Sequence, residues 1–166
     1  MGKVQNGFGN GSAGAVSRSV DDIVITVKNA GDREIPFGAP VFLASGGAVP
    51  FNPESPQDFE SFLGFAVRIP DMTPEVYPSG QNNEPQEGTW KPGEAMEVLV
   101  RGGIVVSLTG GGEQGGGVYI RKSDGALTAA AGQAGSTVLL ENVRVRTPRG
   151  AFQATAEVVV NKRNIL

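Results

Sequence analysis

Short segments in which apolar and polar side chains alternate dominate the pattern along the chain. In residues 20–28 (VDDIVITVK), Ile23, Ile25 and Val27 fall on one face. This period of two is typical of a half-buried β-strand. Comparable segments bounded by Gly, Pro, Asn and Asp predict further strands at 36–43, 65–69, 97–101, 104–108, 118–122, 126–128, 136–146 and 151–161.

This tally of about eight or nine short strands favours an all-β fold, either a compact β-sandwich or a small β-barrel. Composition points the same way, because valine outnumbers leucine by 20 to 8 and branched side chains suit a pleated sheet. The chain has 166 residues, a length that suits one domain.

One short helix is expected between the strands. Ser55 is a favourable N-cap, Pro56 fits the first helical position, and Gly64 can end the helix. Between Pro56 and Gly64, three apolar residues occur at helical spacing: Phe59, Phe62 and Leu63. The expected helix is barely two turns long.

Two glycine- or proline-rich stretches connect the strands in different ways. Gly102 and Gly103 predict a two-residue hairpin turn between the strands at 97–101 and 104–108. Residues 70–93 are rich in Pro, Gly, Asn and Glu, which predicts a long loop. Loops of this length in a compact domain are usually functional or held by a partner.

The N-terminus differs in character from the rest of the chain. Residues 1–19 are glycine-rich, and their sizeable apolar side chains are Val4, Phe8 and Val16. Such a stretch buries too little surface to offset the entropy of ordering it, about 1–2 kcal/mol per residue. We therefore expect residues 1–19 to form a flexible extended arm, ordered only by something outside the domain. Residues 20–166 are then a single β domain.

Composition narrows the function classes. The chain has no His and no Cys, which excludes Ser-His-Asp and Cys-His catalysis, His/Cys metal sites and disulfides. The net charge of −3 gives no basic field for direct nucleic-acid binding. No apolar run approaches the length of a membrane span, and residues 1–15 lack the apolar core of a secretory signal.

Charge is unevenly distributed along the chain. Residues 54–97 carry nine acidic and two basic side chains, a net charge of −7, whereas residues 117–166 carry seven basic and three acidic ones, a net charge of +4. One part of the domain could therefore pair with the opposite part of a neighbour. Two ordinary solvated surfaces explain the pattern equally well.

The short motifs favour structural over chemical roles. Residues 9–14 and 110–115 both match G-x-G-x-x-G, but neither lies between a strand and a helix as a dinucleotide site requires. Asp21 and Asp22 are adjacent in a strand, so their carboxylates point to opposite faces and do not favour a cation site.

A basic segment lies near the C-terminal end of the chain. Arg144 and Arg146 share one face of a predicted strand, and Arg149 follows it. An RNA-binding sheet would interleave aromatic side chains with such basic side chains, and the one aromatic residue near them in sequence is Phe152. A salt-bridging or interface role is therefore favoured.

The order of several motifs resembles a known family. IPFGAPVFL (35–43) is followed by FLGFAVR (62–68), by YPSG…KPGEAMEVLVRGGIVVSL (77–108) and by GGGVYIRKSDGALT (115–128). With the closing strand at 151–161, this order is similar to that of the capsid cement or decoration proteins of tailed bacteriophages. The resemblance covers roughly residues 20–161. It departs from the family in the long loop 70–93 and in the glycine loop 110–117.

The resemblance implies a structural protein of the virion, without enzymatic activity or cofactor. It would be made in the cytoplasm of a bacterial host and would bind the outer capsid surface. Its partners would be the major capsid protein, whose neighbouring subunits it would clamp against the pressure of packaged DNA, and itself, as a dimer or trimer. The residues that we expect to contact these partners are Phe8, Val16, Arg18, Tyr77, Trp90, Arg144, Arg146 and Arg149.

Three alternatives remain open at this stage. Tyr77 and Trp90 could pack the loop 70–93 onto its own domain instead of a partner. The chain could be a β-type virion module that binds a carbohydrate or receptor, or another head or tail accessory protein, although one Trp and two Tyr are few for a glycan site. An enzyme using a carboxylate pair is also possible, but no spacing singles out a pair.

Overall fold

The computed structural model describes residues 11–17, 21–54, 59–69, 88–148 and 154–162. Nearly all of its regular elements are strands, which confirms the prediction of an all-β fold. The elements are β1 (Ile23–Lys28), β2 (Ile35–Pro36), β3 (Pro40–Ala44), β4 (Gly47–Pro50), the 3₁₀ turn η1 (Phe59–Ser61), β5 (Phe62–Ala66), β6 (Thr89–Trp90), β7 (Ala95–Ser107), β8 (Gly117–Arg121), β9 (Leu127–Thr128), β10 (Thr137–Thr147) and β11 (Thr155–Val160).

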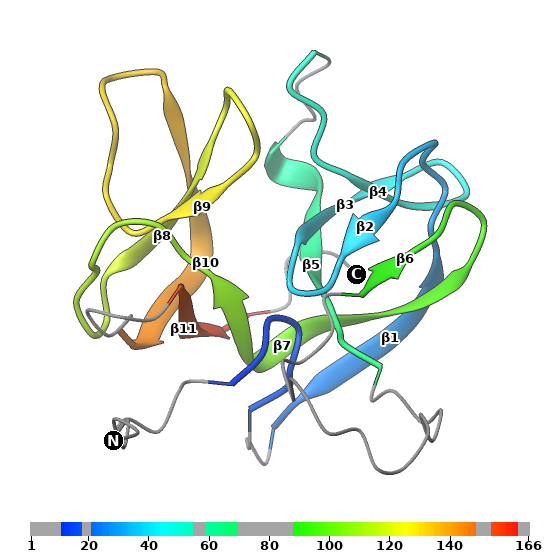
Figure 1. Cartoon of the computed structure of the whole chain (residues 1–166), viewed down its shortest axis with the longest axis horizontal. Helices are drawn as coiled ribbons and strands as arrows, with labels where there is room; N and C mark the ends of the chain where they lie inside the picture. The colour runs from blue at the N-terminus through cyan, green and yellow to red at the C-terminus, as the bar shows by residue number, and fades with distance from the viewer. Residues whose placement is uncertain (1–10, 18–20, 55–58, 70–87, 149–153, 163–166) are drawn as a thin grey trace, which may run out of the picture.

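The strand β7 is shared by two halves of one antiparallel sheet. The sheet has nine strands in the order β4-β3-β5-β7-β11-β10-β8-β9, with β1 also paired to β7, and β2 and β6 form a separate pair. We call β1–β6 with residues 95–101 the N-terminal half, and residues 102–107 with β8–β11 the C-terminal half. Figure 1 shows these halves on the right and left, joined by β7.

Each half curls back on itself. In the N-terminal half, β4 returns to the end of β1, where the Ala30 N–H donates to the Ala48 carbonyl at 2.9 Å. In the C-terminal half, β9 returns to the end of β7 through a parallel bridge between Thr109 and Thr128. The expected compact, barrel-like β architecture is therefore present, built twice around one long strand.

Two hydrophobic clusters form the core. The first includes residues of both halves, most of them from the C-terminal half, and contains Phe42, Phe62, Phe65, Val67, Leu99, Ile104, Val106, Leu108, Val118, Ile120, Leu127, Leu140, Val143, Val145, Ala156, Val158 and Val160. The second fills the N-terminal half and contains Ile35, Val41, Ala48, Leu63, Ala66, Trp90, Met96, Val98 and Val100. Because β7 contributes to both clusters, the halves are expected to unfold together.

The predicted hairpin at Gly102 and Gly103 is wrong, because β7 continues through both residues. Its first part pairs with β1 and β5, and its second part pairs with β11. Leu99 and Ile104 both face the first cluster, although alternation would place them on opposite faces. Between these two residues, the strand therefore reverses which of its alternating side chains point towards the first cluster. Gly102, with φ of +115°, supplies the required bend.

The predicted helix is also wrong, since only residues 59–61 form a 3₁₀ turn and Phe62–Ala66 is the strand β5. Residues 55–58 lie outside the described part of the chain. Pairing of β3 with β5 shifts register so that Val41 faces Gly64 and Phe42 faces Phe62. Such a bulge places Phe62 and Phe65 in the same cluster three residues apart, a spacing that imitates a helix.

Two strands were not expected from the sequence. The strand β4 follows a tight turn at Gly46, and β6 lies within the predicted loop 70–93. Residues 70–87 of that loop lie outside the described part of the chain. The register pairs Trp90 with Ile35, so the end of the loop is part of the folded N-terminal half.

Candidate functional site

Residues 11–17 of the predicted arm lie against β7 and are held by the domain itself. The Val105 N–H donates to the Ala15 carbonyl at 2.9 Å, and the Ser17 N–H donates to the Gly103 carbonyl at 2.9 Å. Gly14 links the two halves, since its N–H donates to the Val105 carbonyl and its own carbonyl accepts from the Arg68 N–H, both at 2.8 Å. These backbone bonds attach residues 11–17 to β7 and to Arg68.

The arm contributes one described candidate contact residue. Val16 forms an antiparallel bridge with Ile104, and 38% of its surface remains exposed. An exposed valine beside the central strand is available to a partner. The candidates Phe8 and Arg18 lie outside the described residues.

Trp90 is packed into its own domain. It is 6% exposed, its Nε1–H donates to the Val67 carbonyl at 3.0 Å, and its ring meets that of Phe37 edge to face at 6.0 Å between centroids. The alternative in which Trp90 secures its loop to the domain therefore describes the structure, and we no longer count Trp90 among the exposed contact residues. Tyr77 lies outside the described part of the chain.

Arg144 and Arg146 lie on the outward face of β10, as the alternation predicts, because Val143 and Val145 beside them are buried. The Arg146 Nη1 lies 3.6 Å from Glu157 Oε1, which confirms a salt-bridging role for this residue. The Arg144 Nη1 donates to the Glu141 and Val143 carbonyls at 3.0 and 2.9 Å. Arg149 lies outside the described residues.

Asn29, which directly follows β1, is a buried structural residue. Its side-chain amide donates to the Arg33 and Trp90 carbonyls at 3.0 and 3.1 Å, and its Oδ1 accepts from the Gly31 N–H at 3.1 Å. Asn29 is fully buried, so these bonds satisfy groups that water cannot reach. No sequence signal separates such an asparagine from an ordinary turn residue.

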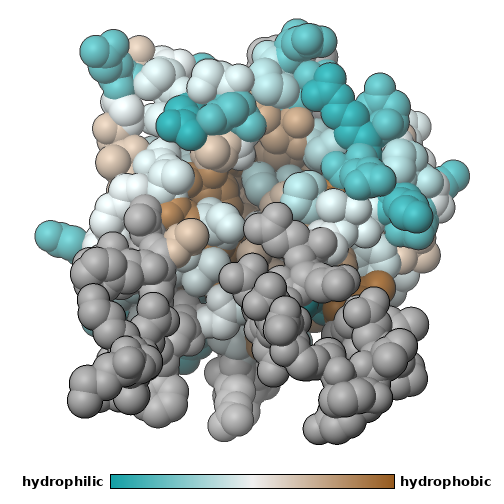
Figure 2. Space-filling model, in the orientation of Figure 1, coloured by the Kyte–Doolittle hydropathy of each residue, from teal (hydrophilic) through white to brown (hydrophobic). Residues whose placement is uncertain are grey.

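A shallow apolar hollow lies between the two halves. Two adjoining cavities of about 330 and 460 Å³ share a wall formed by Pro36, Phe37, Ser107 and Ala154. Figure 2 shows hydrophobic surface in the hollow near the middle of this face, with hydrophilic side chains along the upper and right-hand edges. Among the residues that the structure describes, none that lines either cavity is acidic.

A third cavity, of about 400 Å³, lies between η1 and β10 and includes Glu60 and Glu141. Both glutamates are exposed to solvent, so they lack the burial that tunes paired carboxylates for acid–base catalysis. Within the described residues, no three acidic side chains converge where a metal ion could bind. The first two cavities are lined mainly by apolar groups, whereas the third includes polar side chains.

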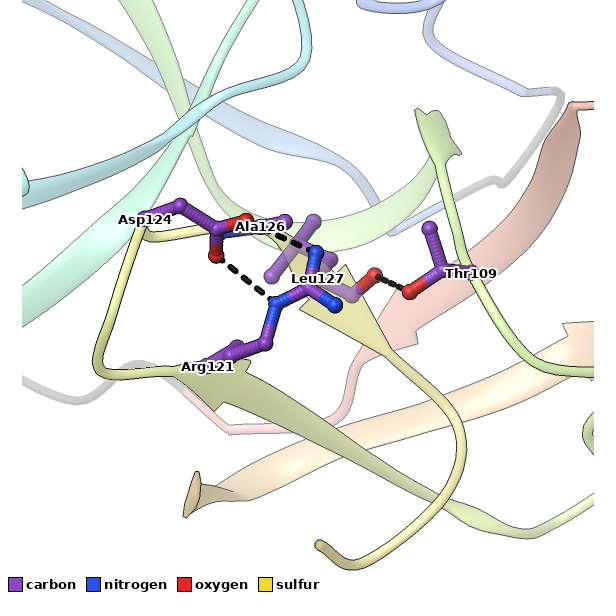
Figure 3. A network of polar contacts seen from close by, with 5 residues as sticks. All are labelled: Thr109, Arg121, Asp124, Ala126 and Leu127. Carbon is purple, nitrogen blue, oxygen red and sulfur yellow. Dashed lines mark hydrogen bonds and ion pairs between the residues drawn. The ribbon is translucent and has the colours of Figure 1, made fainter. Parts of the chain in front are cut away.

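The turn between β8 and β9 is fixed by polar contacts (Figure 3). The Arg121 Nε donates to Asp124 Oδ1 at 2.8 Å, and the Ala126 N–H donates to the same oxygen at 3.1 Å. The hydrogen bond from Arg121 lowers the pKa of the Asp124 carboxyl, and the same contact raises the pKa of Arg121. Both side chains are exposed, so the network shapes a surface turn.

The described segments include no helix with the length and hydropathy that crossing a bilayer requires. No curated protein matches the sequence.

Two comparisons identify relatives of the chain. A solved chain described as "The capsid of Myoviridae Phage XM1" has the same fold, with a TM-score of 0.71 and 17% identity, covering 97% of this chain and 96% of that one. Residues 2–161 match the family described as structural cement protein (E217 gp24/Pam3 gp6). Since this match spans nearly the whole sequence, the chain belongs to the structural cement protein family.

Proposed function

We propose that the protein binds the outer surface of a bacteriophage head and clamps neighbouring major capsid subunits, so that the shell withstands the pressure of packaged DNA. The observation that carries this proposal is the family match over residues 2–161. The fold shared with a chain of a phage capsid structure adds support. The proposal assigns the protein no catalytic reaction and no cofactor.

The architecture suits a clamp that acts in many copies. A repeating shell offers many equivalent sites, so weak contacts by each copy can sum to a strong effect on the particle. The shared strand β7 makes the two halves one body, which can transmit force between subunits. We further propose that copies associate as dimers or trimers on the shell.

The contact residues in this proposal are those that keep a surface-facing side chain or lie outside the described part of the chain. They are Phe8, Val16, Arg18, Tyr77, Arg144, Arg146 and Arg149. Among the described ones, Val16 offers exposed apolar surface and the two arginines of β10 face outward.

The test uses phage particles from which this protein has been removed. On heating, the depleted particles should release DNA, detected with an intercalating dye, at a lower temperature than native particles. Adding the purified protein back should restore the native release temperature. If native, depleted and restored particles release DNA at the same temperature, the clamping function is wrong.

A further inference from the structure

The outward face of the C-terminal half carries an unusual group of side chains. Tyr119 on β8, Leu139 on β10 and Val159 on β11 point away from the core, because their strand neighbours Val118, Leu140, Val158 and Val160 are buried. Leu139 is 39% exposed, and the other two are half-buried. Apolar side chains on an outward sheet face expose apolar surface to water, and a binding partner could cover that surface.

These side chains form one continuous patch around Arg144. Leu139 lies directly across from Tyr119, and Arg144 lies across from Val159 on one side and Gly117 on the other. A Cβ placed at Gly117 would lie 2.9 Å from Leu139 Cδ1 and 3.3 Å from Tyr119 Cε2, so both side chains lean over this glycine towards Arg144. We call Tyr119, Leu139, Arg144 and Val159 the outer patch.

The charge at the centre of the patch is not neutralised by another described side chain. Arg121 pairs with Asp124 and Arg146 pairs with Glu157, whereas the contacts of Arg144 are with the backbone carbonyls of Glu141 and Val143. Those carbonyls accept hydrogen bonds from Nη1 and so hold the guanidinium in place. A fixed guanidinium with further N–H donors is suited to a carboxylate.

The wider charge distribution supports the same partner. The segment 117–166 has a net charge of +4 in a chain whose net charge is −3. Arginine and tyrosine beside aliphatic groups are also the residue types enriched where proteins bind one another. The patch therefore fits a protein surface with an acidic side chain flanked by apolar ones.

We propose that the outer patch binds an acidic and apolar segment exposed on the outer surface of the major capsid subunit. This inference rests on the proposed function and goes beyond it by naming the face of the molecule and the chemistry of its partner. Arg144 would pair with the carboxylate, and Tyr119, Leu139 and Val159 would cover the apolar side chains beside it.

Co-sedimentation with depleted particles tests the proposal. Leu139→Asp and Arg144→Glu should each weaken binding at least tenfold, without a change in the melting temperature of the isolated protein. Leu43→Asp is the matched control, because Leu43 on β3 is 40% exposed but lies outside the patch. It should bind within twofold of the wild type. Binding by the wild type should weaken as NaCl is raised, and binding by Arg144→Gln should depend less on salt.

Each outcome has a distinct meaning. If the wild type binds and both patch variants bind equally well, the outer patch is not the contact face and the inference is wrong. If the variants lose self-association, measured by light scattering, together with shell binding, the patch joins copies of this chain and the inference is equally wrong. If the wild type itself fails to bind, the proposed function fails with it.

Discussion

The two halves of the molecule differ in where they place their most informative side chains, which are buried in the N-terminal half and face outward in the C-terminal half. The N-terminal half buries Asn29 and Trp90, with their polar atoms bonded to backbone groups. The C-terminal half keeps Leu139 and Arg144 on its outward face. An aromatic or polar residue in a loop of such a protein therefore indicates binding only when it is exposed. The predictions below separate residues that hold the fold together from residues that face a partner.

The largest effect is expected for Trp90→Ala. Removing this buried ring and its hydrogen bond to Val67 should lower the free energy of unfolding by about 3–5 kcal/mol. Urea unfolding of the isolated protein measures the change. Tyr119→Ala is the comparison from the other half and should cost clearly less, because Tyr119 is half-buried on an outward face. Equal stability losses would contradict the distinction between the halves.

The next effect is expected for Asn29→Ala, which leaves the Arg33 and Trp90 carbonyls and the Gly31 N–H without their side-chain partner. Buried groups left unpaired in this way should cost about 2–3 kcal/mol in unfolding free energy. Asn161→Ala, at an exposed position, should stay within about 0.5 kcal/mol of the wild type. A loss below about 1 kcal/mol at Asn29 would show that water replaces its bonds.

A smaller effect is expected where residues 11–17 join the halves. Gly14 has φ of +81°, and a Cβ there would lie 2.8 Å from Phe37 Cβ and 2.9 Å from the Arg68 nitrogen. Gly14→Ala should therefore cost about 2 kcal/mol. Gly46 has a similar φ of +88° with no atom within 4 Å of its Cβ position, so Gly46→Ala isolates the backbone strain and should cost less. If the two variants lose equal unfolding free energy, the close contacts at Gly14 add nothing to the cost of its positive φ.

The smallest effect concerns the exposed turn of the C-terminal half. Because pairing with Arg121 lowers the pKa of Asp124, the pair stabilises the fold above the unfolded-state pKa of this carboxyl. This contribution is lost as the pH falls through the lowered, folded-state pKa. Asp124→Asn should slightly lower the melting temperature at neutral pH, and the difference from wild type should shrink in acid. A difference that grows in acid would contradict this account.

The predictable part of the fold came from alternation of side chains. The strands predicted at 20–28 and 136–146 correspond to β1 and β10, whose more buried and more exposed residues lie on opposite faces. The helical spacing of Phe59, Phe62 and Leu63 misled because these residues belong to a short 3₁₀ turn and the strand β5. Gly102 and Gly103 misled because a bend within β7 imitates a turn. Both features arise from pairing with strands distant in sequence, which local patterns do not encode.

The candidate site was predictable only in part. The common face of Arg144 and Arg146 follows from alternation, and the structure has it. The burial of Trp90 depends on Phe37 and Val67, which are distant in sequence and become neighbours only in the folded chain. The apolar members of the outer patch were also missed, because Tyr119, Leu139 and Val159 come from three strands whose register brings them together.

The most direct test of the central claim is a cryo-electron microscopy map of the native particle at side-chain resolution. The account predicts density for this chain on the outside of the shell, with each copy touching at least two neighbouring major capsid subunits. Density for the chain inside the shell, in the tail, or in contact with one subunit alone would contradict it.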